Sequence, residues 1–328
     1  MGRDLPRANA ARAEIKDRRA TLASVVDTPA DSSDDSRDRI ARGVLFALIV
    51  ALTLAMSWTS LTTLLRLSFR EEQYSHILVI PQISAFLFYL ERRRIFSHLA
   101  TQRPVGFGLL SAGFFFYWFG LHHSASLSEN DRLAMAVFPM VLIWIGGFVL
   151  SYGLRAFQEG LFPLLFLLLM VPLPDFFLKR AIHWLQIGSA EVTSALFQAV
   201  DVPVVRTGLV FALPGITIEV AEECSGIRSS IALVITSLFA GHILLRSVWR
   251  KATLTVATLP LLFVKNGIRI VTVSLLAVYV DPSFMTGRLH RQGGIVFLLL
   301  ALAMLLPVLW WLRKSERSSN DRTSAEVF

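Results

Sequence analysis

The segment "ECSGIRSSIALVITSLFAGHILL", residues 223–245, joins a short polar stretch to a long apolar one. From Ile231 onward its only ionisable residue is His242, and about 20 such residues can cross the hydrocarbon core of a bilayer. The polar stretch contains Cys224, which is the only cysteine in the chain. The segment therefore predicts a membrane-spanning helix that begins close to a single thiol at one membrane surface.

The composition of the whole chain agrees with a membrane protein. Its 328 residues are 54% hydrophobic and 17% charged, with a mean hydropathy of +0.57, which excludes an ordinary soluble domain. We predict an all-α polytopic fold, because a helix satisfies its own backbone polar groups inside a bilayer. Two of the eight candidate spans, the second and the fifth, are short and contain proline. The candidates are 43–64, 76–91, 105–122, 133–152, 156–173, 228–247, 252–277 and 294–312.

The charged residues indicate the topology and exclude nucleic acid as a partner. The net charge is +8, but the Lys and Arg residues concentrate in the segments that alternate on one side of the predicted spans. This is the distribution of cytoplasmic loops, so both termini are expected in the cytoplasm. We predict a disordered tail over 1–40, a transmembrane domain over 41–313 and a second tail over 314–328. No cleavable signal peptide is expected, because the first 40 residues lack an apolar stretch.

One outer segment, 174–223, is long enough to form structure outside the bilayer. Its first part predicts an amphipathic helix that lies on the outer leaflet, with apolar residues at spacings of three, four and seven. Its second part predicts a short β-hairpin, because Pro214 and Gly215 form a turn signal and residues 216–220 alternate in the strand manner. The apolar face of the helix consists of Leu178, Ile182, Leu185, Val192, Leu196 and Val200.

Cys224 lies where a thiol could be reactive. Arg228 follows one helical turn later, and both a guanidinium and a helix N-terminus favour the nucleophilic thiolate. Glu223 opposes this effect if it points at the sulfur, but it could instead face water or a partner. The alternative interpretation is that Cys224 is a small apolar filler, as most lone cysteines in membrane proteins are.

The seventh apolar run, "LFVKNGIRIVTV", is interrupted by Lys265, Asn266 and Arg269. A charge inside a span is costly, so it normally has a partner or a function. Counted from residue 252, Arg269 lies about 25 Å along the helix, in the outer half of the membrane. The alternative role for Arg269 is a structural charge that binds buried carbonyl groups.

Two histidines flank predicted spans on the outer side, His76 in "EEQYSHILVIP" and His290 in "DPSFMTGRLHRQGG". A nucleophile, a cation for an oxyanion and an acid/base group are thus available on one side of the membrane. These are the components of thiol-based acyl transfer, which needs no cofactor or metal. Either histidine could instead be an ordinary interfacial side chain.

Three stretches, "GLVFALPGITIEVAEECSGIRSS", "NGIRIV" and "HRQGGIVF", resemble the signature motifs of the exosortase/archaeosortase family. "YSHILVIP" and "MVPLP" resemble weaker upstream motifs, and the resemblance covers residues of about 60–313. One departure is Ile77, where the family usually has glycine.

The resemblance implies a multi-pass cysteine transpeptidase of the bacterial cytoplasmic membrane, with its active site on the periplasmic side. Members process exported proteins with a C-terminal tail: a Pro-Glu-Pro type motif, a transmembrane helix and a basic cluster. Matched motif by motif, Cys224 is the nucleophile of a thioester mechanism, with Arg269 and His290 as its catalytic partners. Four neighbouring residues are expected to support catalysis or bind substrate. They are Arg228, Glu223, Asn266 and His76.

The expected partners are tail-bearing substrate proteins, an unidentified acceptor nucleophile and membrane lipid. Two other functions compete with this one: a transporter whose pathway contains Arg228, Lys265 and Arg269, and a non-catalytic component of exopolysaccharide export. No internal repeat with paired broken helices supports the transporter. A non-catalytic component gives no reason for a thiol beside Arg228.

Overall fold

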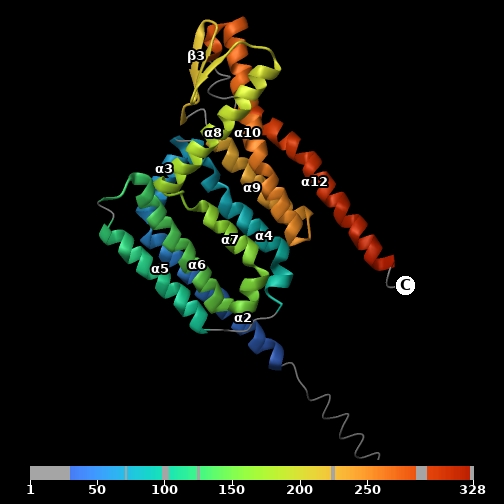
Figure 1. The fold of residues 1–328 in the computed structure, drawn as a ribbon. Coiled ribbons are helices and arrows are strands. Elements are labelled where there is room, and N and C mark those ends of the chain that lie inside the picture. Colours follow the sequence, from blue (N-terminus) through green and yellow to red (C-terminus); the bar gives the residue numbers. More distant parts are fainter. Residues whose placement is uncertain are drawn as a thin grey trace, which may run out of the picture.

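The computed structural model describes residues 30–70, 72–97, 103–123, 126–222, 226–285 and 294–325. These residues form a helical bundle with a narrower protrusion at one end, where a small sheet is found (Figure 1). The α-helices are α2 (Ala30–Met56), α3 (Trp58–Arg70), α4 (Ile80–Ile95), α5 (Arg103–His123), α6 (Glu129–Glu159), α7 (Leu161–Phe166), α8 (Asp175–Ala199), α9 (Ile227–Leu244), α10 (Val248–Tyr279) and α12 (Gly294–Ala325). The 3-10 helices are η1 (Glu72–Leu78), η3 (Leu167–Met170) and η5 (Pro282–Met285).

The all-α polytopic fold is confirmed, but with fewer full-length spans than predicted. Six of the described helices, α2, α5, α6, α9, α10 and α12, are long and apolar enough to cross a membrane. A seventh span is possible if α7 with η3 is counted together with α8, to which it is bent by 88°. The run 76–91 instead forms η1 and the 16-residue α4, and the run 156–173 is divided among α6, α7 and η3. Proline explains both breaks, because Pro81 and Pro163 lie in the first turns of α4 and α7.

The short segments still connect the two ends of the bundle. At one end, Arg94 of α4 donates a hydrogen bond to Glu159, the last residue of α6. At the other end, Asn130 near the start of α6 donates from Nδ2 to the carbonyl of Leu173, 2.6 Å away. Both α4 and the α7–η3 segment therefore run between the same two ends as α6. As a result α2 begins and α12 ends on the same side, opposite the protrusion (Figure 1).

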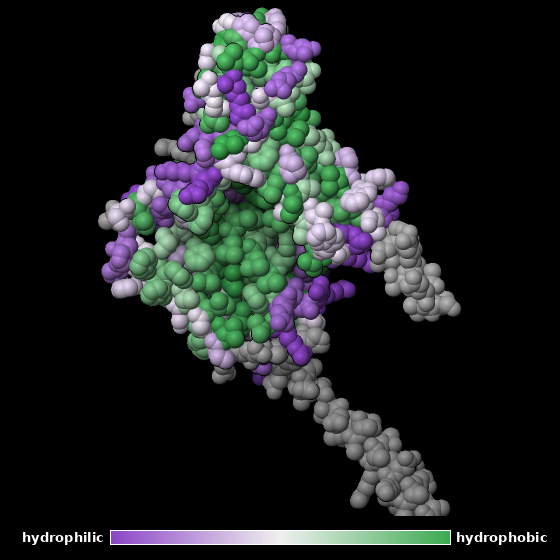
Figure 2. Space-filling view, in the orientation of Figure 1, coloured by the Kyte–Doolittle hydropathy of each residue, from purple (hydrophilic) through white to green (hydrophobic). Residues whose placement is uncertain are grey.

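The bundle has an apolar core and an apolar surface. In the core, Phe148 is 2% exposed and packs against the rings of Phe46, Phe88 and Tyr152. Helix α5 exposes large apolar side chains, and a broad hydrophobic surface covers the face of the bundle that is seen in Figure 2. Such a surface is suited to lipid, because a soluble monomer rarely exposes so large an apolar patch.

The protrusion consists of α8, the outer part of α10 and the sheet (Figure 1). The sheet is antiparallel in the order β1–β2–β3, with β1 at Val205–Thr207, β2 at Val210–Leu213 and β3 at Ile216–Glu219. The predicted hairpin is confirmed as β2–β3, and Gly215 provides the left-handed residue of its turn with φ of +85°. The sequence analysis did not predict β1.

Helix α8 contains the predicted amphipathic helix, but its buried face packs along α10 rather than on lipid alone. Ile182 and Leu185 of the predicted face are buried, whereas Val200 is 50% exposed. Contact with α10 is close because Gly267 has no side chain: a Cβ there would lie 2.7 Å from Cγ1 of Val192.

Both ends of the described chain are helical beyond the predicted limits of the transmembrane domain. Helix α2 begins at Ala30, within the predicted tail 1–40, and α12 continues to Ala325, beyond residue 313. Residues 1–29 of the predicted tail lie outside the described residues.

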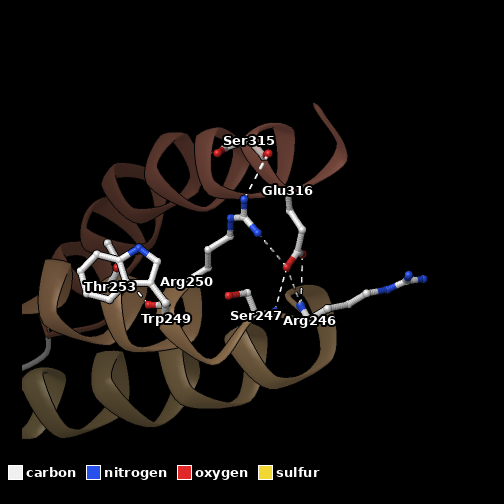
Figure 3. A network of polar contacts seen from close by, with 7 residues as sticks. All are labelled: Arg246, Ser247, Trp249, Arg250, Thr253, Ser315 and Glu316. Carbon is white, nitrogen blue, oxygen red and sulfur yellow. Dashed lines mark hydrogen bonds and ion pairs between the residues drawn. The ribbon is translucent and has the colours of Figure 1, made fainter. Parts of the chain in front are cut away.

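The turn between α9 and α10 is held by α12 at the end of the bundle opposite the protrusion. Figure 3 shows the Glu316 carboxylate pointing at this turn, where it accepts the backbone N–H groups of Arg246 and Ser247 at 3.1 and 2.8 Å. Arg250 adds an ion pair at 3.4 Å and a hydrogen bond to the Ser315 carbonyl at 3.2 Å. One side chain of α12 thus caps the first turn of α10 and fixes three helices together.

Candidate functional site

The residue that precedes α9, Gly226, adopts a backbone conformation suited to glycine. Its φ is +68° and its ψ is 20°, in the left-handed region. It is also buried: a Cβ there would lie 2.7 Å from Oδ1 of Asn266 and 3.0 Å from Nζ of Lys265. Gly226 and the "KNGIR" stretch of α10 therefore meet in space.

Lys265 holds the first turn of α9 in place. Its side chain is 1% exposed, and Nζ donates to the Gly226 carbonyl at 3.3 Å and to Oγ of Ser229. The same carbonyl accepts the N–H and the hydroxyl of Ser230, at 2.9 and 2.8 Å. A buried ammonium group needs such acceptors, so this contact fixes the position of α10 relative to the start of α9.

Helix α8 is joined to the same site by the hydrogen bonds of two amide side chains, one on α10 and one on α8 itself. Asn266, also 1% exposed, donates from Nδ2 to Oγ of Ser189 at 2.9 Å. One turn earlier on α8, Gln186 donates from Nε2 to the carbonyl of Val220, just after β3, at 2.8 Å. Both the strand that leads to Cys224 and the helix that follows it are thus attached to one α8–α10 framework.

Three cations gather at this place. Arg228 is exposed on the first turn of α9, and Arg269 lies on α10 one turn after Lys265, half-buried. The charge of Arg269 acts electrostatically on both Arg228 and Lys265. At 1.5 Å per residue, Arg269 is about 32 Å from the first residue of α10, roughly the thickness of a bilayer core. The cluster can therefore attract an anion or stabilise a developing oxyanion at the boundary of the membrane.

The other predicted site residues are distributed as follows. His76 is partly buried in η1, and η1 packs against α9. Cys224, Glu223 and His290 lie outside the described residues, so the convergence of Cys224 with Arg269 and His290 stays a prediction.

The sequence analysis missed two residues of the site and one contact. Lys265 was recognised as an intramembrane charge, but its contact with Gly226 was not foreseen. Gln186 and Ser189 were not predicted, because the spacing of apolar residues identifies only the apolar face of α8. Their spacing of three, with Thr193 four residues later, places a polar stripe on one helical face and could have revealed them.

No metal centre is found among the described residues, where no group of three or more His, Cys, Asp or Glu side chains could hold an ion.

The apolar surface and the candidate spans define a multi-pass membrane protein. The family description that matches the sequence is that of a transmembrane exosortase, over residues 58–307, and the chain belongs to this family. No curated protein and no solved structure matches the chain.

Proposed function

We propose that this chain is a membrane cysteine transpeptidase that cleaves C-terminal sorting tails at the outer face of the bacterial cytoplasmic membrane. The observation that carries the proposal is the contact of Gly226 with Lys265 and Asn266. It brings Gly226, which follows Cys224 by two residues in the sequence, to the helix that carries Arg269. Membership of the exosortase family supports the same assignment, because this family generally consists of cysteine transpeptidases.

In the proposed reaction, the Cys224 thiolate attacks the carbonyl carbon of the scissile peptide bond. The oxyanion that forms is stabilised by Arg269. The carbon–nitrogen bond then breaks, and the departing amine takes a proton from His290, which leaves a thioester. An acceptor nucleophile or water attacks the thioester, gives its proton to His290 and releases the thiolate.

The surrounding residues have supporting roles in this proposal. Arg228 stabilises the negative charge of the thiolate. Asn266 fixes the positions of α8, α10 and Gly226 relative to one another. Glu223 and His76 contact the substrate near the thiol.

The substrate is proposed to dock its tail helix against the bundle, with its Pro-Glu-Pro type motif at the protrusion and its basic cluster in the cytoplasm. Both termini of this chain are then cytoplasmic, which agrees with the distribution of Lys and Arg.

The decisive experiment is co-expression with a reporter protein that carries such a tail. Wild type should shorten the reporter, whereas Cys224→Ala and Cys224→Ser should not, although both insert into the membrane. Labelling of the lone thiol in intact cells with a membrane-impermeant maleimide should succeed, since the site is proposed to face outward. Equal shortening by all three chains would refute a catalytic thiol.

A further inference from the structure

The last strand of the sheet, β3, has a free edge. In the order β1–β2–β3 it pairs with β2 and with no other strand of the described chain. Its side chains alternate, with Thr217 and Glu219 exposed and Ile218 and Val220 buried. An edge strand presents backbone N–H and C=O groups that can pair with another extended chain.

The register shows which backbone groups face that edge. The N–H of Val220 donates to the carbonyl of Leu209 at 3.0 Å, so Val220 turns its N–H toward β2. In an antiparallel pair every second residue does this, and the residues between them turn their polar groups away. Ile218 therefore faces β2, while Thr217 and Glu219 face outward. Among the described residues, no hydrogen bond satisfies the outward backbone groups of Thr217 or Glu219.

The opposite edge of the sheet is less suited to pairing. Strand β1 has three residues, and its central Arg206 donates to the Gly208 carbonyl at 2.9 Å and to Glu191 at 2.7 Å. The hydrogen bond with Glu191 raises the pKa of Arg206 above its usual value, so the charge persists. Strand β1 is thus shorter than β3, and its charged central side chain is already bound to Glu191 of α8, so this edge is the less suited to pairing.

The free edge leads directly to the proposed active site. Cys224 follows Glu219 by five residues, which span at most about 17 Å when extended. The start of this segment is fixed by the hydrogen bond from Gln186 to the Val220 carbonyl, and its end by the contact of Gly226 with Lys265. A peptide paired with β3 would thus lie within a few residues of the thiol.

We propose that the outer edge of β3 binds an extended peptide as a fourth strand, and that this peptide is the substrate segment just ahead of the tail helix. The inference rests on the proposed function, which supplies a peptide joined to a membrane helix. Pairing through the main chain gives affinity for many sequences, and alternate side chains add specificity. This suits an enzyme that must hold the backbone of different substrate proteins in the same way.

Disulfide trapping tests the pairing directly. The chain would carry Cys224→Ala with Thr217→Cys, and reporters would each carry one cysteine at successive positions ahead of the tail helix. We expect cross-links at every second reporter position, because the side chains of a paired strand alternate. The matched control is Ala212→Cys, since Ala212 faces Thr217 on β2 but lies one strand away from the edge. Cross-links without this period, or equally strong ones at Ala212→Cys, would overturn the inference.

A proline at the edge tests the hydrogen bond. Thr217→Pro removes the outward N–H and leaves the β2 ladder intact, and proline is tolerated on edge strands in this orientation. At low reporter concentration we expect cleavage to fall about three- to tenfold, the effect of one lost hydrogen bond. Thr217→Val also loses the hydroxyl but keeps the N–H, so the fall with Thr217→Pro should clearly exceed any change with Thr217→Val. Cleavage by Thr217→Pro at the wild-type rate would contradict the pairing.

The two experiments separate this inference from the proposed chemistry. The trapping experiment needs no catalysis, because Cys224 is absent from the chain. Periodic cross-links with a wild-type chain that cleaves no reporter would support the docking edge and reject the peptidase. Normal cleavage without periodic cross-links would reject the docking edge and leave the peptidase intact.

Discussion

At the scale of single residues, Gly226 decides whether the segment that carries the thiol can fit against α10. Its left-handed backbone is accessible to other residues at a cost of about 1–2 kcal/mol. The larger obstacle is space, since Asn266 and Lys265 occupy the volume that a Cβ would need. Conformation and packing thus select glycine at the same position.

We predict that Gly226→Ala impairs reporter cleavage by more than tenfold, because the added Cβ must displace a buried amide or ammonium group. The reporter assay and thermal unfolding in detergent measure the two consequences. The matched control is Gly208→Ala: Gly208 has φ of +63°, yet its Cβ would meet no atom within 4 Å. If both variants behaved alike, backbone strain alone would explain the effect.

A substitution of Lys265 separates the effect of this residue on cleavage activity from its effect on thermal stability. Lys265→Met has a similar shape but removes the charge and the bonds to Gly226 and Ser229. Replacement of a buried charge by an apolar group is often neutral or stabilising, so we expect an unchanged or higher melting temperature. We expect cleavage to fall at least tenfold, since the start of α9 loses its attachment to α10. Full activity of this variant would show that the lysine is not needed to position the site.

At the scale of elements, α8 and α10 form a polar interface inside an apolar protein. Ser189 accepts a hydrogen bond from Asn266 at 2.9 Å, and both side chains are buried. The bond holds the helix that supports β3 to the helix that carries the cation cluster. Movement between them would therefore change the site as a whole.

We predict that Ser189→Ala destabilises the protein by about 1–3 kcal/mol, because a buried amide donor loses its acceptor. Ser274→Ala provides the control on α10 itself. Ser274 is 1% exposed, but its hydroxyl donates to the Ile270 carbonyl of its own helix at 2.6 Å. This hydrogen bond therefore does not connect α10 to another helix. Thermal unfolding should lower the midpoint for Ser189→Ala and leave it nearly unchanged for Ser274→Ala.

At the scale of the whole molecule, α10 connects the two ends of the protein. Its 32 residues extend about 48 Å, longer than a bilayer core, so its outer part rises into the protrusion. Its first turn is fixed by Glu316 of α12 at the opposite end (Figure 3). The position of the candidate site thus depends on contacts at both ends of one helix.

We predict that Glu316→Gln lowers stability by about 1–2 kcal/mol, because an amide cannot replace the carboxylate toward the two backbone N–H groups of Arg246 and Ser247 and toward Arg250. Limited proteolysis at Arg246 and thermal unfolding would both report the loss. Glu159→Gln is the control, since Glu159 pairs with Arg94 where both side chains are well exposed and such a pair contributes little. Equal effects of the two variants would argue against a stabilising role for the contacts between Glu316 and the α9–α10 turn.

Local sequence patterns are sufficient to predict the class of the protein and several of its elements. Hydrophobic runs predict spans because the bilayer sets their length, and α5, α6, α9 and α10 lie within a few residues of the runs that predicted them, apart from the longer ends of α6. The β2–β3 hairpin was predictable from Pro214 and Gly215, since turn residues act locally. Two of the eight predicted runs form shorter or divided helices instead of full-length ones, because proline divides an apolar run without changing its hydropathy.

Which residues meet in the site could not be predicted from these local patterns. Lys265 and Gly226 are 39 residues apart, and no periodicity links them. The polar stripe of α8 can be assigned a role only because α10 packs against it. The edge of β3 is free because no fourth strand covers it in the described chain. Hydropathy and turn signals depend on near neighbours and on the solvent, so they can be recognised in the sequence alone. Contacts between distant segments depend on how whole helices pack, and so they emerge only in three dimensions.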